Sequence, residues 1–260
     1  MNRTVTGSFV LAFAVALSGA AHSAAVIDLS WNACSPIVHD RILPPGATTS
    51  DLYVLGSGIT GTTDGYEVWI FMGQNVSANC SPRVVADAWR FDAAGCQGPS
   101  FFNVSLSSAS KSCPSLKGDP SFSSFLLEYD TSVGQLVFRA TVAYGGSPQL
   151  ADPNLTYLLA RLTFDHTYAV SGPGDPPNTC GGFEKSMCFT LWGGSNVKGD
   201  CFGPGQIAFA NYERTDGSLI PFGPGPVNVT SFRTDPGIAA CEPATPVHAT
   251  TWGAVRGMYR

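Results

Sequence analysis

Apolar and polar residues alternate with a period of two along much of the chain. In YLLARLTFDHT (residues 157–167) one set of positions is apolar and the other is polar: Leu158, Ala160, Leu162 and Phe164 against Arg161, Thr163, Asp165 and Thr167. Because the side chains of a β-strand point alternately to opposite faces, this segment predicts a strand with one buried face. QLVFRATVAY (residues 135–144) repeats the pattern.

Two pairs of such segments predict β-hairpins. Residues 125–130 (FLLEYD) precede residues 135–144 by a short loop that ends in Gly134. Residues 206–221 (QIAFANYERTDGSLIP) place an Asp-Gly dipeptide, which is favoured in tight hairpin turns, between two strand-like halves. Residues 65–72 (GYEVWIFM) are apolar on both faces apart from Glu67, which indicates a central strand.

Shorter strands are expected at residues 52–55, 88–92, 101–106, 187–192 and 227–232. About nine or ten strands, separated by clusters of Gly and Pro and with no helical period before the last residues, predict an all-β fold. An antiparallel β-sandwich is the first expectation and a barrel the second.

The N-terminus predicts a secretion signal. Arg3 is followed by a short apolar run at residues 9–17 and by small residues at 18–25. The run is shorter than the ~18 residues of a membrane-spanning helix, and no other segment reaches that length. We therefore expect a signal peptide at 1–25, a β-sandwich domain at 26–240, and a proline-containing linker with a short tail at 241–260. The expected mature chain is secreted or held at the cell surface, without a transmembrane span.

Eight cysteines lie outside the predicted signal: Cys34, Cys80, Cys96, Cys113, Cys180, Cys188, Cys201 and Cys241. An even count in an exported chain predicts disulfides, and the spacings lack the C-x-x-C pairs of zinc sites. Cysteines that are neighbours in the sequence are the expected partners: 96 with 113, 180 with 188, 201 with 241 and, by elimination, 34 with 80.

Charge and motifs exclude some functions. Only 13% of the residues are charged and the net charge is -5, so no basic surface for nucleic acid is expected. The sequence contains neither a G-x-S-x-G nucleophile motif nor an EF-hand loop. Scattered oxygen ligands in TTDG, GDPP and KGD leave a structural Ca²⁺ open, and no other cofactor or metal is expected.

No catalytic residue is assigned from the sequence. A glycosidase needs two carboxyl groups that face one cleft, and Glu67, Glu128, Asp130 and Asp165 are the candidates on strands. Glu67 is the least expected charge, and we interpret it as a protective charge on an edge strand or as the buried partner of an arginine such as Arg139. His166, at the inward face of its strand, is expected to be buried with a hydrogen bond.

Tyr157 and Tyr212 fall on the outward positions of their strands, so they are candidates for ligand contact, whereas most tryptophans are expected in the core. The tail TTWGAVRGMYR (residues 250–260) adds further candidates. In a short helix Trp252, Val255 and Tyr259 would form one apolar stripe, with Arg256 and Arg260 near its C-terminus: this stripe could contact the sandwich or a partner, or stay free.

The order DLYVLGSGI, GYEVWIF, AWRF, YLLARLTF and ANYERTDGSLIP resembles a cohesin-type or related carbohydrate-binding β-sandwich. With LSWNAC near its start and its tryptophan-containing end, the chain is also similar to a group of uncharacterised exported bacterial proteins. The resemblance implies a disulfide-stabilised sandwich of the immunoglobulin, cohesin or jelly-roll kind. Cohesins are usually poor in cysteine, so dockerin binding is not carried over.

A non-enzymatic module that binds or displays outside the cell is the function expected from these observations. A polysaccharide or a cell-surface protein is the expected partner. Two alternatives stay open: a secreted carbohydrate-active enzyme, and a structural subunit of a surface assembly.

Overall fold

The computed structural model describes most of the chain between residues 25 and 233. The described ranges are 25–32, 34–44, 47–74, 85–107, 113–116, 122–131, 134–144, 150–169, 180–183, 186–191, 210–214, 219–221, 223–224 and 229–233. The predicted signal peptide and the predicted tail lie outside these residues. None of the helices in the described ranges is long and apolar enough to cross a membrane.

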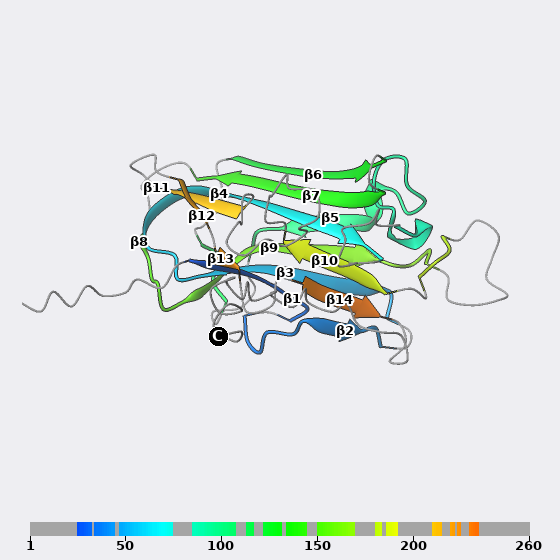
Figure 1. Cartoon of the computed structure of the whole chain (residues 1–260), viewed down its shortest axis with the longest axis horizontal. Coiled ribbons are helices and arrows are strands. Elements are labelled where there is room, and N and C mark those ends of the chain that lie inside the picture. Colours follow the sequence, from blue (N-terminus) through cyan, green and yellow to red (C-terminus); the bar gives the residue numbers. More distant parts are fainter. Residues whose placement is uncertain are drawn as a thin grey trace, which may run out of the picture.

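One layer of the fold is a five-stranded sheet (Figure 1). Its strands pair antiparallel except at one edge, where the first two run parallel. In spatial order they are β13 (Gly223–Pro224), β1 (Val26–Ser30), β3 (Thr49–Ser57), β9 (Thr156–Asp165) and β5 (Phe102–Ser105).

The second layer is a nine-stranded sheet built around the long strand β4 (Gly61–Gly73). β7 (Gln135–Ala143) pairs with β4 along one edge, β6 (Phe122–Asp130) pairs with β7, and β8 (Leu150–Ala151) pairs with the start of β4. Along its other edge β4 pairs with β11 (Ala210–Arg214), which in turn pairs with β12 (Leu219–Pro221). Further along the same edge β4 pairs with β10 (Met187–Leu191), β10 pairs with β14 (Val229–Arg233), and β14 pairs with β2 (Asp40–Ile42). The all-β sandwich and both hairpins expected from the alternation are confirmed.

Aromatic side chains from both layers meet at Trp89, which is fully buried between the sheets. Its ring centroid lies 5.6 Å from that of Phe164 on β9 and 5.5 Å from that of Phe189 on β10. The expected strand at residues 88–92 is wrong, because this segment forms a 3₁₀ turn, η1 (Asp87–Trp89), and an irregular loop. A turn places both Trp89 and Phe91 in the core without a neighbouring strand to pair with.

A β-bulge changes which residues of β9 face the core. Val54 of β3 pairs with Ala160 and Leu55 pairs with Leu158, so Leu159 is the extra residue. Tyr66 of β4 donates a hydrogen bond from its hydroxyl to the carbonyl oxygen of Leu159 across the sandwich. The expectation that Leu158 faces the main core is therefore wrong: its side chain packs on the outer face of the five-stranded sheet.

Two disulfides are described, and both join distant parts of the sequence. Cys34 bonds to Cys113 and Cys96 bonds to Cys180, with sequence separations of 79 and 84. Cys188 is also disulfide-bonded, with a partner outside the described residues.

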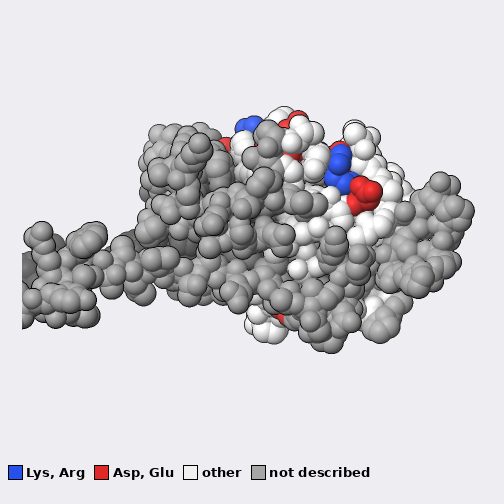
Figure 2. Space-filling model, turned by 45° about the vertical axis from the view of Figure 1, so that its right-hand side comes forward, with Lys and Arg blue, Asp and Glu red and all other residues white. Residues whose placement is uncertain are grey.

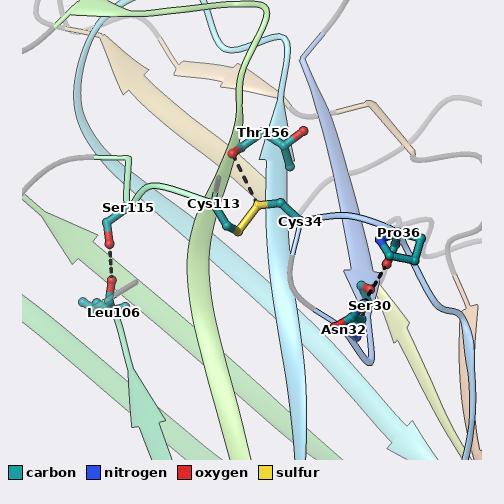
Figure 3. The surroundings of a disulfide bond; sticks show 8 residues. All are labelled: Ser30, Asn32, Cys34, Pro36, Leu106, Cys113, Ser115 and Thr156. Atoms are coloured by element: carbon teal, nitrogen blue, oxygen red, sulfur yellow. Dashed lines mark hydrogen bonds between the residues drawn. A yellow bond between two sulfur atoms is a disulfide. The ribbon is translucent and has the colours of Figure 1, made fainter. Parts of the chain in front are cut away.

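The expected pairs of neighbours, 96 with 113 and 180 with 188, are wrong, and so is 34 with 80, while 201 with 241 lies outside the described part. The folded arrangement of the strands, and not proximity in the sequence, decides which cysteines meet. Cys34 follows β1 and Cys113 lies beside β9, and the two meet on the outer face of the five-stranded sheet, where Cys34 Sγ also contacts the carbonyl oxygen of Thr156 (Figure 3).

Candidate functional site

A cleft of about 790 Å³ opens at the end of the β6–β7 hairpin, beside β4. This volume falls within the range of small-molecule pockets. Carboxyl groups and aromatic rings line it together with small apolar side chains. The lining residues are Trp69, Phe71, Asp92, Ala93, Ala94, Leu127, Glu128, Tyr129, Asp130, Gln135 and Val137.

Three paired strands, β4, β7 and β6, form the floor of the cleft. Phe71 of β4 lies opposite Val137 of β7, which lies opposite Glu128 of β6, and Trp69 lies opposite Arg139 in the next row. Neighbouring residues of β4 and β7 along the same strands, such as Ile70 and Phe138, are fully buried in the core. Since side chains alternate along a strand, the rows of Phe71 and Trp69 belong to the outer face of the sheet.

Glu67, Trp69 and Arg139 form one polar cluster on this outer face. Arg139 Nη2 lies 2.7 Å from Glu67 Oε1, and the indole N–H of Trp69 donates to the same oxygen at 3.1 Å. The guanidinium carbon of Arg139 lies 4.8 Å from the centroid of the Trp69 ring. The pairing of Glu67 with Arg139 is confirmed, but both side chains are partly exposed instead of buried. One face of the Trp69 ring is covered by the cation.

A tight loop after η1 forms the opposite rim of the cleft. Arg90 donates to both carboxyl oxygens of Asp92, at 2.6 and 2.8 Å, and its guanidinium carbon lies 3.7 Å from the centroid of the Tyr129 ring. The hydrogen bond from Arg90 holds the pKa of Asp92 below its usual value. Gly95 closes the loop so tightly that a Cβ atom there would lie 2.1 Å from the carbonyl oxygen of Arg90.

Charged side chains form two acid–base pairs within the described ranges. On the face drawn in Figure 2 the described surface is largely uncharged, and its blue and red atoms gather in a few places. The two described salt bridges, Arg90 with Asp92 and Arg139 with Glu67, both belong to the cleft or its border.

The carboxyl groups of the cleft are poorly arranged for hydrolysis. Asp92 is held ionised by Arg90, so it is unsuited to donate a proton to a leaving group. Glu128 and Asp130 occupy alternate positions of one strand and so stand on the same side, whereas a glycosidase pair flanks the scissile bond. The described lining holds no serine, threonine, cysteine or histidine that could form a nucleophile–base pair.

The sequence left a structural Ca²⁺ open at scattered loop oxygens. Within the described ranges, no group of three or more His, Cys, Asp or Glu side chains could hold a metal ion. The scattered loop oxygens of the sequence remain an untested prediction.

His166 is a core residue. It is 4% exposed, its Nε2 lies 2.8 Å from Ser50 Oγ, and its ring packs 4.9 Å from Trp89. Burial lowers its pKa to about 3, so the ring is neutral at physiological pH. The expectation of a buried, hydrogen-bonded histidine is confirmed.

Among the ligand-contact residues expected from the sequence, Tyr157 is the one whose side chain is described, and it does not line the cleft. Tyr157 is 6% exposed and its hydroxyl accepts a hydrogen bond from the backbone N–H of Asp152 at 2.7 Å. Its expected outward position is wrong, because the bulge at Leu159 turns residues 157 and 159 towards the core. Tyr212 lies on β11 opposite Tyr66, and its side chain is not among those described. Five more lie outside the described residues: Trp252, Val255, Arg256, Tyr259 and Arg260.

Among solved structures, two cohesin modules show a loose likeness to this chain. No family model matches the sequence, and neither does any curated protein. The second type II cohesin module of the adaptor ScaA scaffoldin of Acetivibrio cellulolyticus is 13% identical, over 87% of this chain and 97% of the module, with a TM-score of 0.40.

A type II cohesin domain from the cellulosome of the same bacterium is 10% identical, over 83% of this chain and 98% of the domain, with a TM-score of 0.37. Both are cohesins, the type of domain that the sequence loosely resembles. The likeness is loose, and it assigns neither a family nor a ligand to this chain.

Proposed function

We propose that this chain is an exported, non-enzymatic binding module that holds a segment of another protein in the cleft beside Trp69. The observation that carries the proposal is the lining of the cleft. Phe71, Leu127 and Val137 offer apolar contact, and Glu128 and Asp130 add carboxylates at the end of β6. Such a surface suits an apolar segment that carries lysine or arginine.

A protein segment fits this lining better than a polysaccharide does. Sugars bind through their C–H faces to open aromatic rings. Here the guanidinium of Arg139 lies over Trp69, and that of Arg90 lies over Tyr129. Each ring therefore has one face already engaged by a cation, which leaves less planar surface for a pyranose.

Export is supported by the disulfides. Cys34–Cys113 and Cys96–Cys180 would persist in an oxidising compartment and be reduced in most cytosols. Together with the predicted signal at residues 1–25, they favour a location outside the cell or at its surface.

A carbohydrate-active enzyme is the second candidate, because the cleft brings together the carboxyl groups of Asp92, Glu128 and Asp130. Hydrolysis of polysaccharides by the wild-type chain, lost in Glu128→Gln and Asp130→Asn, would support the enzyme and contradict the binding module. The pairing of Asp92 with Arg90 predicts no such activity.

The proposal is tested by selection from a displayed library of random twelve-residue peptides, with the exported chain as the bait. We expect enriched sequences that combine apolar side chains with Lys or Arg. Val137→Lys places a cation on the apolar floor and should weaken these peptides at least tenfold. Leu150→Lys makes the same kind of change at a side chain that is 76% exposed on β8, outside the cleft, and should leave binding unchanged.

Two results would contradict the protein-segment proposal. One is the absence of enriched peptides together with a hit on a parallel glycan array, which would point to a sugar ligand. The other is an enriched family that binds Val137→Lys and the wild-type chain equally well, which would place the site elsewhere.

A further inference from the structure

Strand β6 forms an open edge of the nine-stranded sheet. It pairs with β7 over all nine of its residues, from Phe122 opposite Ala143 to Asp130 opposite Gln135. On its other side the described part of the chain provides no further strand, and Figure 1 shows β6 as the outermost arrow of its layer. The backbone N–H and C=O groups on that side are therefore positioned to pair with a further strand.

The features that usually protect an edge strand are missing from most of β6. Residues 122–127 (FSSFLL) contain no charge, proline or glycine, and the register with β7 runs without a bulge. Phe122 is 55% exposed and Leu126 is 44% exposed. An edge that is long, regular and apolar favours the addition of a strand from another molecule.

The inner side of the same edge is apolar as well. A recess of about 360 Å³ lies between β6 and β5, lined mainly by Phe91, Phe102, Val104, Phe125 and Leu127. A strand that continues β6 in the plane of the sheet would place its own inward side chains next to this recess.

We propose that β6 pairs antiparallel with β6 of a second copy of this chain, across a two-fold axis at Leu126. In this register Leu126 faces its own counterpart, Ser124 faces Glu128 of the second copy, and Phe122 faces its Asp130. Each carboxylate thus lies opposite an uncharged residue. A parallel, in-register pairing would instead set Glu128 against Glu128, which is unfavourable.

The same register keeps the two faces of the sheet in phase. Phe125 lies opposite Leu127 of the second copy, so inward apolar residues meet inward apolar residues across the axis. The β6 strand of a second copy therefore matches the open edge of β6 in both its charged and its apolar positions. The resulting two-fold interface uses the same patch on each subunit and closes at a dimer.

The pairing places the outer faces of the two β4–β7–β6 layers on the same side of one continuous sheet. Both clefts would then face the same partner surface, and a partner with two binding segments would be held with higher avidity. The dimer itself does not depend on the proposed ligand.

Sedimentation equilibrium of the exported chain between 1 and 100 μM tests the dimer. We expect the wild-type chain to approach twice the monomer mass. Leu126→Lys, which sets two cations against each other on the axis, should weaken the dimer at least tenfold. Leu150→Lys, the same substitution at a more exposed leucine of β8, should dimerise like the wild type.

A second variant keeps the proposal testable if Leu126→Lys fails to fold. In Leu126→Cys the new cysteines would lie opposite each other with Cα atoms about 4.5–5.5 Å apart, which is within the range of a disulfide. Non-reducing electrophoresis should show a cross-linked dimer for Leu126→Cys and a monomer for Leu150→Cys.

Three results would overturn the proposal: a wild-type monomer at 100 μM, a Leu126→Lys chain that dimerises unchanged, or larger aggregates in place of a dimer. Peptide binding in the cleft is measured separately on the Leu126→Lys chain, so the failure of either proposal is recognised independently.

Discussion

The Cys34–Cys113 bond is expected to supply a large share of the stability of this sandwich. Both sulfurs pack with Leu55 and Leu158 in a small cluster on the outer face of the five-stranded sheet. The perturbation is the double replacement Cys34→Ala with Cys113→Ala, which removes the cross-link without leaving an unpaired thiol at either position.

The magnitude follows from the length of the loop that the bond closes. A disulfide stabilises mainly by restricting the unfolded chain, and the effect grows with the loop. For the separation of 79 residues the loop-entropy relation predicts about 4.5 kcal/mol at 25 °C. A bond between Cys96 and Cys113, which are 113 − 96 = 17 residues apart, would contribute only about 3 kcal/mol.

Loss of packing by the two sulfurs adds about 1 kcal/mol, so we expect the double variant to lose about 4–6 kcal/mol. Since domains are commonly stable by only about 5–15 kcal/mol, this change is large. Urea unfolding of the exported chain, followed by tryptophan fluorescence, measures the free energy of unfolding of both forms.

A loss below about 2 kcal/mol would refute the long-loop argument. A peptide map of the unreduced chain that links Cys96 to Cys113 would refute the pairing itself. As a matched comparison, the variant that lacks Cys96 and Cys180, whose separation is 84, should lose a similar amount.

Two further predictions concern single side chains, and a third concerns an ion pair. Burial raises the pKa of Asp28 from 3.8 to about 6, so the folded chain keeps a proton that the unfolded chain releases, and stability should fall as the pH rises from about 4 to 6. Asp28→Asn should therefore raise the free energy of unfolding by about 1–2 kcal/mol at pH 8, which is less than the full pKa shift implies because solvent screens the charge. At pH 3.5 the same substitution should change the free energy of unfolding little. An equal gain at both pH values would contradict this prediction. Trp89→Leu should cost about 3 kcal/mol or more in urea unfolding, since the ring is fully buried among other aromatics, and a cost below 1 kcal/mol would argue against that packing. A double-mutant cycle of Glu67→Gln and Arg139→Met should give a coupling below about 1 kcal/mol, because the pair is partly exposed, and a larger coupling would mean that the pair is shielded from solvent.

Strands were predictable where a regular alternation continued for several residues. Residues 135–144 and 157–167 alternate over most of their length, and both are strands. β2, β8 and β13 are two or three residues long, too short for any pattern to be visible. The bulge at Leu159 escaped prediction because it depends on the partner strand β3, and it reversed the faces assigned to Tyr157 and Leu158.

The cleft was predictable only in part. Alternation along residues 135–144 sets Arg139 apart from the core, and Glu67 stands out as the one charge in residues 65–72. Their pairing was one of the two interpretations of Glu67. The rim formed by Asp92 and its neighbours could not be found, because an irregular loop has no period. Tyr129 occupies an inward position of β6 by alternation, and only the approach of Arg90 from that loop brings it into the site.

Disulfide pairing could not be derived from spacing, because the partners are brought together by strands that are distant in the sequence. Cys96 lies in the loop after η1, whereas Cys180 forms a bridge with Ala169, shortly after β9. The bond between them also anchors the loop that carries Asp92, so the connectivity bears directly on the cleft.

Hydrogen–deuterium exchange of the Leu126→Lys chain, with and without an enriched peptide, tests the proposed binding site most directly. This variant keeps β6 free of a second copy, so any protection reports on the peptide. We expect slower exchange at residues 67–71, 92–94, 127–131 and 134–137, which line or border the cleft. Protection confined to β3 and β9 of the five-stranded sheet, or none at saturating peptide, would contradict the account.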